Sequence, residues 1–126
     1  MKQIIIDQYL LPNVTKILQS TDVGIIVTTN ENISIAVPDN GTHFALEELK
    51  EAIGGGYIEP YYLHDQIQLC SNIPLARVNW IMFGDDEAKH KSLPLNQIAT
   101  SIFRDAFKTR DTIRGDVILV PFKMVE

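Results

Sequence analysis

Short runs rich in β-branched and aromatic residues, separated by turn-forming residues, make up most of the hydrophobic pattern of the chain. Residues 23–29 (VGIIVTT) and 33–38 (ISIAVP) flank Asn-Glu-Asn, and two such runs around a short polar turn predict a β-hairpin. For residues 12–20 (PNVTKILQS) the pattern leaves open an extended segment or a short helix. Further strands are expected within 2–7, 57–63, 67–71, 79–84 and 117–125.

Two other segments have helical rather than alternating spacing. Residues 42–56 (THFALEELKEAIGGG) predict a helix with Thr42 as its N-cap and a run of glycines to end it. A second helix is expected to begin near 92–97 (SLPLNQ), with Pro94 in its first turn. Its apolar face would comprise Ile98, Ala99, Ile102, Phe103 and Ala106. The pattern therefore predicts an α+β fold, a mostly antiparallel sheet with two helices packed on it, in a single domain over residues 1–126.

The composition is that of an ordinary globular protein, with 45% hydrophobic and 21% charged residues. No apolar run approaches the roughly 20 residues that cross a bilayer, so no membrane partner is expected. The first residues lack the apolar region of a signal peptide, and the single cysteine, Cys70, cannot form an internal disulfide. We therefore expect a cytoplasmic protein with Cys70 packed in the sheet.

Positive charge is concentrated in one segment of an acidic chain. The net charge is −5 at pH 7, which argues against binding to long nucleic acids. A positive segment on an acidic body suits a small anion better than a long polyanion. Within residues 88–114 six basic residues stand against two acidic ones: Lys89, Lys91, Arg104, Lys108, Arg110 and Arg114 against Asp105 and Asp111.

Several kinds of reactive site have no signature in the sequence. Residues 54–59 (GGGYIE) follow a predicted helix and precede a strand, whereas a phosphate-binding glycine loop follows a strand and opens a helix. The three histidines are scattered, and the consecutive acids at 85–87 are typical of a solvated loop, so no metal is expected. No nucleophile motif or tuned acid–base pair is present, and we expect no enzymatic activity and no cofactor.

The junction before the last strand is the best candidate for chemistry. Arg110 and Arg114 are four residues apart, and they project from one side if the preceding helix persists for another turn. If the segment is a loop, its backbone N–H groups become available to an anion as well. Guanidinium groups match phosphate oxygens two at a time, and Thr112 adds a hydroxyl donor. The alternative is that Arg110 pairs with Asp111 or Asp105 on the surface.

Two further residues are candidates for contacts with a base. Alternation places Trp80 and Met82 on one face of their strand and Phe83 on the other, where Phe83 could stack on a nucleobase at the strand end. The alternative for Phe83 is a core or edge position. Asn96, near the start of the second helix, has an amide that could read a base edge or a hydroxyl; the alternative is capping or exposure to solvent.

An ordered set of motifs is similar to a family of unknown function common in phage and prophage genomes. The motifs are ALEELKEAIGGGYIE, SLPLNQIATSIF and IRGDVILV, which together span roughly residues 44–120. They match that family's Leu-Glu-Glu-Leu helix, its Gly-Gly-Tyr-Ile-Glu step, its Leu-Pro-Leu-Asn helix start and its Gly-Asp-Val strand. Gln97 and Ile98 stand where that family often has two basic residues.

The size of the chain, its layout and its Phe…Arg-x-x-x-Arg spacing also resemble the first Thoeris anti-defence proteins of phages. Those proteins sequester glycocyclic ADP-ribose signals made by bacterial TIR-domain enzymes and assemble as oligomers, and some hold cyclic oligonucleotides at separate sites. The resemblance implies that Phe83 stacks on adenine, that Arg110 and Arg114 hold the pyrophosphate, and that Asn96 makes a polar contact.

The expected function is therefore a phage-encoded sponge that binds a cyclic nucleotide signal in the infected host's cytoplasm without degrading it. Tight binding needs an enclosed pocket, and a subunit interface can form one, so a homo-oligomer, a dimer or a hexamer, is expected. A protein-binding inhibitor of a host enzyme is the alternative, with residues 57–63 (YIEPYYL) as its exposed strip. A small enzyme such as a cyclic-nucleotide phosphodiesterase is the third possibility.

Overall fold

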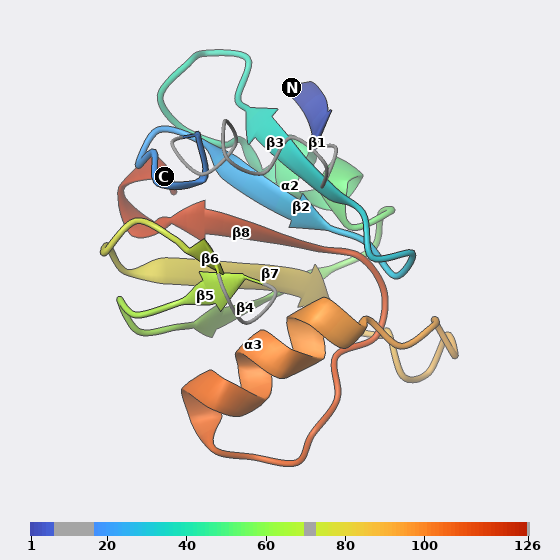
Figure 1. Cartoon of the computed structure of the whole chain (residues 1–126). Coiled ribbons are helices and arrows are strands. Elements are labelled where there is room, and N and C mark those ends of the chain that lie inside the picture. The colour runs from blue at the N-terminus through green and yellow to red at the C-terminus, as the bar shows by residue number, and fades with distance from the viewer. Residues whose placement is uncertain (7–16, 70–72, 126) are drawn as a thin grey trace.

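The computed structural model describes residues 1–6, 17–69 and 73–125 (Figure 1). Its elements confirm the predicted α+β class. In chain order they are β1 Lys2–Ile6, β2 Gly24–Val27, β3 Ile33–Val37, α2 Leu46–Ala52, β4 Ile58–Tyr62, β5 Gln68–Leu69, β6 Ile73–Pro74, β7 Trp80–Asp85, α3 Gln97–Phe107, β8 Val117–Pro121 and the short 3₁₀ helix η2 Phe122–Met124. No helix in these ranges is long and apolar enough to cross a membrane.

Six of the strands form one antiparallel sheet in the order β1-β3-β2-β8-β7-β4. The predicted hairpin is confirmed: β2 pairs with β3, with Val27 opposite Ile33. The small strands β5 and β6 form a separate two-stranded sheet (Figure 1). Because β8 and β7 lie inside the large sheet, their side chains are buried on both faces, which explains their nearly continuous apolar sequence.

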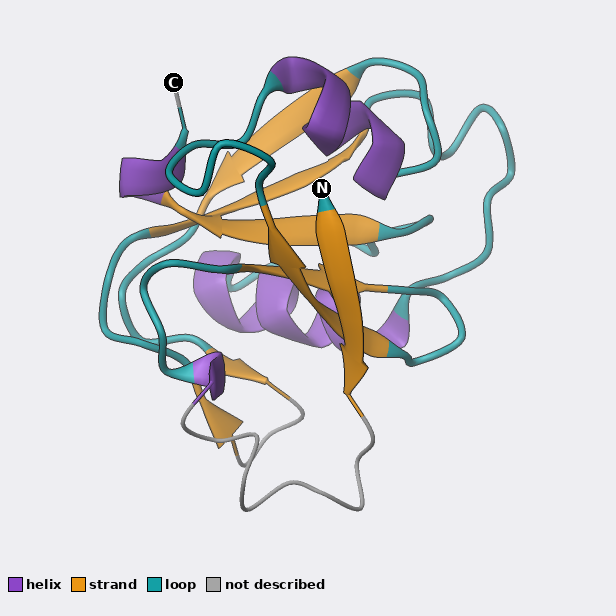
Figure 2. Cartoon of the chain, turned by 90° about the horizontal axis from the view of Figure 1, so that it is seen from above, coloured by secondary structure: helices purple, strands orange, loops and turns teal. Residues whose placement is uncertain are grey.

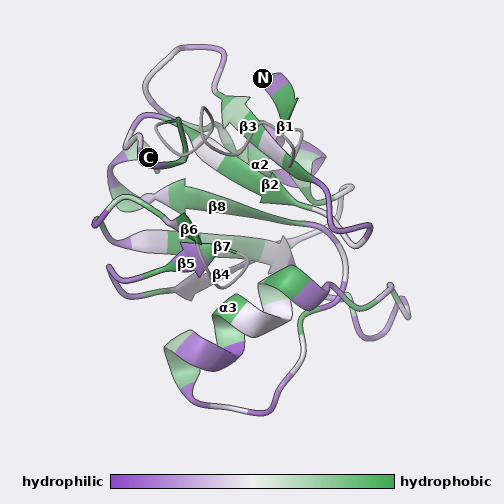
Figure 3. Cartoon of the chain, viewed as in Figure 1, coloured by the Kyte–Doolittle hydropathy of each residue, from purple (hydrophilic) through white to green (hydrophobic). Residues whose placement is uncertain are grey.

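The two faces of the sheet support two separate hydrophobic cores. Met82 lies opposite Leu119 in the β7–β8 pair, and both belong to the core that α3 covers with Ala99 and Ile102. The neighbouring pair of β7 and β8, Phe83 and Ile118, belongs to the other core, which α2 covers with Leu49 and Ala52. Helices on opposite faces therefore give three layers, and apolar residues gather along the central strands (Figures 2 and 3).

The first helix begins later than its sequence predicted. Asn40 Oδ1 accepts hydrogen bonds from the backbone N–H groups of Thr42 and His43, both at 2.8 Å, so Thr42 belongs to a turn and not to an N-cap. Phe44 then forms a β-bridge with Val125, and the helix starts only after Ala45. The glycines end the helix as predicted, each with a positive φ that glycine adopts readily.

Two other boundaries also differ from the prediction. Pro94 precedes α3 and is not in its first turn, because Leu95 forms a β-bridge with Arg114 and the helix begins after Asn96. The last strand ends at Pro121 and the chain continues as η2. The expectations for Cys70 and for residues 12–16 lie outside the described part of the chain.

Candidate functional site

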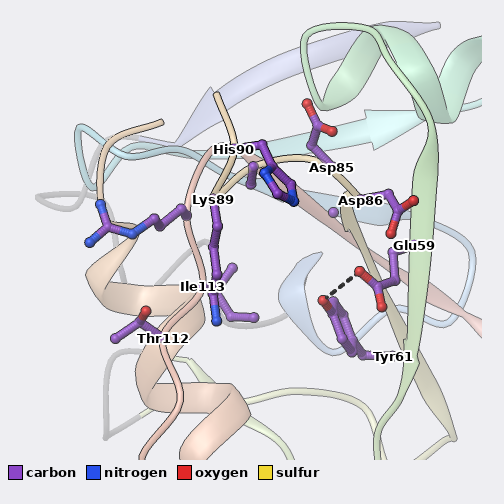
Figure 4. Close-up of a pocket in the computed structure, with 11 residues that line it drawn as sticks. Glu59, Tyr61, Asp85, Asp86, Lys89, His90, Thr112 and Ile113 are labelled. Atoms are coloured by element: carbon purple, nitrogen blue, oxygen red, sulfur yellow. Dashed lines mark hydrogen bonds between the residues drawn. The ribbon is translucent and has the colours of Figure 1, made fainter. Parts of the chain in front are cut away.

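A hollow of about 300 Å³ lies where three segments that are distant in sequence meet (Figure 4). The edge strand β4 forms one side, and the segment before β8 forms another. The end of β7 and the turns that follow it contribute the rest of the lining. The lining residues are Glu59, Tyr61, Gly84, Asp85, Asp86, Ala88, Lys89, His90, Thr112, Ile113 and Arg114. Two of the five ligand-binding residues expected from the sequence, Thr112 and Arg114, are therefore brought to one site.

The segment between α3 and β8 is a loop, which decides between the two alternatives for the arginines. The helix ends at Phe107, and Lys108 takes a left-handed conformation with φ of 52° that stops it. Arg104 then holds the loop from the helix: its Nε donates to the carbonyl of Asp111 at 3.0 Å, and its Nη2 donates to that of Arg110 at 2.9 Å. Thr112 and Arg114 thus lie in a loop that hydrogen bonds from Arg104 hold against α3.

The same loop is fastened again where it reaches the hollow. Thr100 Oγ1 accepts a hydrogen bond from the N–H of Ile113 at 2.9 Å and donates to its carbonyl at 3.2 Å. Gly115 donates its N–H to the carbonyl of Pro94 at 2.8 Å. A Cβ on Gly115 would lie 2.8 Å from Leu93 Cδ1, and its φ of +81° also favours glycine. The backbone on either side of Thr112 and Arg114 is therefore held in place by hydrogen bonds and by close packing.

Asn96 serves this support and is not a ligand contact, which corrects the expectation. Its side chain is fully buried. Its Nδ2 donates to the carbonyls of Val27 and Gly115, both at 3.0 Å, and its Oδ1 caps α3 by accepting from the N–H of Ala99 at 3.0 Å. The amide is thus occupied on both sides, and the capping alternative is confirmed.

Phe83 is also unavailable to a ligand, so its expected stacking role is wrong for this fold. The predicted alternation along β7 is confirmed, but Phe83 is only 4% exposed and packs in the core beneath α2. Stacking on a nucleobase would require this face of β7 to be open at the strand end, whereas a helix and its core cover each face of the sheet.

The two arginines occupy different surroundings. Arg114 lines the hollow and donates from Nη1 to the carbonyl of Leu93 at 3.2 Å, whereas Arg110 is exposed and does not line it. Neither guanidinium forms an ion pair within the described ranges. The alternative pairing of Arg110 with Asp111 or Asp105 is not observed among the described residues, and Asp105 Oδ1 lies 3.7 Å from Lys108 Nζ instead.

Nine lining residues were missed as ligand-binding candidates, and six of them have polar or ionisable side chains: Glu59, Tyr61, Asp85, Asp86, Lys89 and His90. Lys89 and His90 belong to the positive segment found in the sequence. Glu59 and Tyr61 are two apart on a strand, so the period of two already placed them on one face. Nothing in the sequence indicated that this face lies beside the loop of Thr112.

Opposite charges line different sides of the hollow. Figure 4 shows Lys89 extending toward Ile113 and Thr112, across from Glu59 and Tyr61. The Tyr61 hydroxyl donates to Glu59 Oε2 at 3.0 Å. Burial and the hydrogen bond to Glu59 raise the pKa of Tyr61 to about 12, so the hydroxyl stays protonated and remains a donor at neutral pH.

Asp85 anchors the turn that carries Lys89 and His90. Its Oδ2 lies 2.7 Å from Lys91 Nζ, and its Oδ1 accepts from the N–H of Glu87 at 2.8 Å. Burial alone would raise the pKa of this carboxyl, but the hydrogen bonds from Lys91 and Glu87 outweigh it and lower the pKa. The hydrogen bond to Asp85 likewise raises the pKa of Lys91.

This anchor predicts a loss of stability in acid. Because the folded-state pKa of Asp85 is below its unfolded value, its contribution is complete above roughly pH 4 and is lost as the pH falls through the folded value. Asp85→Asn should lower the free energy of unfolding at pH 7 and flatten its decline below pH 4, as measured by urea unfolding. Asp86→Asn is the control, because no ion pair of Asp86 occurs in the described residues. An unchanged acid limb in Asp85→Asn would contradict the assignment.

Comparison of the chain with protein-family models, curated proteins and solved structures finds no match. Among the residues that the structure describes, no group of three His, Cys, Asp or Glu side chains could hold a metal ion.

Proposed function

We propose that this protein binds a small phosphorylated nucleotide signal in the hollow and sequesters it without turnover. The observation that carries the proposal is the cationic side of the hollow in an otherwise acidic chain. There Lys89 and Arg114, neither ion-paired within the described ranges, lie in one lining with the Thr112 hydroxyl. An oxyanion is the ligand that satisfies all three groups.

The hydrogen bonds of Arg114 favour a phosphate over a point anion. One N–H of its guanidinium is used by the carbonyl of Leu93, and this contact orients the group without neutralising its charge. A guanidinium carries five N–H donors, so several remain for two oxygens of one phosphate. Lys89 adds a mobile ammonium, and the Thr112 hydroxyl adds a neutral donor.

The size of the hollow limits the ligand. A volume of about 300 Å³ is at the lower end of the range for small-molecule sites and fits one nucleotide unit better than an oligonucleotide. The resemblance of the sequence to the Thoeris anti-defence proteins supports a cyclic ADP-ribose derivative as the ligand class in this proposal, with the infected bacterial cytoplasm as the setting. In the same proposal a second copy of the chain covers the hollow, because a sponge needs slow release.

A second candidate function has an observation in its favour. Tyr57, which precedes the edge strand β4, is 70% exposed, and Tyr62, the last residue of this strand, is 64% exposed. Exposed tyrosines on a sheet edge are typical of a protein-binding surface, so contact inhibition of a host enzyme is the alternative.

Recovery of the ligand tests the proposal directly. The protein is mixed with cyclic ADP-ribose, or with its glycocyclic isomers, and free ligand is measured in the filtrate. We expect depletion of the ligand at one equivalent per site, and its return chemically intact after the protein is denatured by heat. Recovery of a cleaved product would show an enzyme instead, and no depletion would favour the protein-binding alternative.

A further inference from the structure

The side of the hollow across from Lys89 cannot hold a phosphate. It carries the carboxylate of Glu59, with Asp86 beside it, and both would repel an anion (Figure 4). We infer that Glu59, positioned by Tyr61, accepts hydrogen bonds from the sugar hydroxyls of the ligand and makes the site selective for phosphorylated ribosides. This inference rests on the proposed function, and it assigns the half of the hollow that phosphate binding leaves unexplained.

Glu59 is held in place before any ligand arrives. Its Oε2 accepts the Tyr61 hydroxyl at 3.0 Å, and within the described ranges Oε1 has no hydrogen-bond partner. The Tyr61 ring is itself fixed, because it packs edge-on against Phe103 of α3 with ring centroids 5.1 Å apart. The hydroxyl remains a donor at neutral pH, so one carboxylate oxygen is occupied and the other is available. A preorganised acceptor of this kind costs little to use on binding.

The chemistry of a carboxylate selects the group that it receives. An ionised carboxylate only accepts hydrogen bonds, so its partner must be a donor such as a hydroxyl. Carboxylates that bind the ribose hydroxyls of a nucleotide recur in dinucleotide-binding folds, beside a separate phosphate site. Here Glu59 comes from β4 and the cations come from other segments, so the two groups are held on different sides of one cavity.

Two ligands separate this inference from phosphate binding itself. Cyclic ADP-ribose contains both phosphate and ribose hydroxyls, whereas inorganic pyrophosphate contains only the anionic part. We expect Glu59→Gln to weaken binding of cyclic ADP-ribose by roughly 10- to 100-fold, the usual effect of losing a charged hydrogen bond. Pyrophosphate should bind the variant as well as the wild type or better, because a repelling charge is gone. Isothermal titration calorimetry measures both.

Tyr61→Phe is the matched test of positioning. It removes the hydroxyl that holds Glu59 and keeps the ring that packs against Phe103. We expect a loss of several-fold for cyclic ADP-ribose and none for pyrophosphate, with an unchanged melting temperature. A variant that merely disturbs the fold would weaken both ligands alike.

The outcomes distinguish the two levels of the proposal. If the wild type binds both ligands and Glu59→Gln leaves their affinity ratio unchanged, this inference is overturned and the phosphate site stands. A 2′-deoxy analogue provides a second check: it should bind the wild type more weakly than its ribose parent and should lose that deficit in Glu59→Gln. If the wild type binds neither ligand, the proposed function itself fails.

Discussion

Replacing Asn96 with alanine is expected to lower the free energy of unfolding by roughly 2–4 kcal/mol. The substitution removes the N-cap of α3 and leaves the carbonyls of Val27 and Gly115 without their donor in a fully buried position. Val27 belongs to β2 and Gly115 to the loop before β8, so the amide of Asn96 connects the sheet and this loop to the start of α3. Urea unfolding followed by circular dichroism measures the loss.

Asn96→Asp is the matched variant because it keeps the capping oxygen and loses only the two donors. We expect it to be destabilised at neutral pH at least as much as Asn96→Ala, since a buried carboxylate would face two carbonyl oxygens. Ser101→Ala, at an exposed position of the same helix, serves as the control and should change stability by less than about 0.5 kcal/mol. A stable Asn96→Ala protein that no longer binds the ligand would restore the original ligand role of this residue.

The strands and the face of α3 could be predicted because each depends on a local period. Alternation assigned Met82 and Phe83 to opposite faces, and the 3.6-residue spacing assigned Ala99 and Ile102 to the core. Helix starts could not be predicted to the residue, because β-bridges to distant segments decide them. Phe44 is held by Val125, and a local signal at Thr42 carries no information about that contact.

The candidate site was only partly predictable, for a physical reason. The sequence indicated where cations gather, and Lys89 and Arg114 both come from that positive segment. It could not show that β4 and the turn after β7 lie beside the loop before β8. These segments meet because β7 pairs with β4 on one side and with β8 on the other, and no local pattern in the sequence encodes this pairing. For this reason Glu59 and Tyr61 were missed, and Arg110 was grouped with Arg114 on spacing alone.

Arg114→Ala should weaken binding of the phosphorylated ligand by roughly 10- to 100-fold, while Arg110→Ala should weaken it by less than about threefold. The two arginines are equivalent in the sequence, but only Arg114 lines the hollow. Its loss should leave the fold intact, because the side chain is exposed and, among the residues that the structure describes, makes one hydrogen bond, to the carbonyl of Leu93. Calorimetry with cyclic ADP-ribose measures both variants, and their melting temperatures check the fold.

Arg114→Lys shows whether the fork or the charge is required. If the guanidinium binds two phosphate oxygens, lysine keeps the charge and still loses much of the affinity, whereas a purely electrostatic contact would be largely rescued. Raising the salt concentration should weaken ligand binding by the wild type more than ligand binding by Arg114→Ala. The variant has one cation fewer to attract the phosphate, so salt has less attraction to screen. Equal losses from Arg110→Ala and Arg114→Ala would contradict a site confined to the hollow, since Arg110 lies outside it. The ratio of the two losses therefore tests the placement of the site independently of the identity of the ligand.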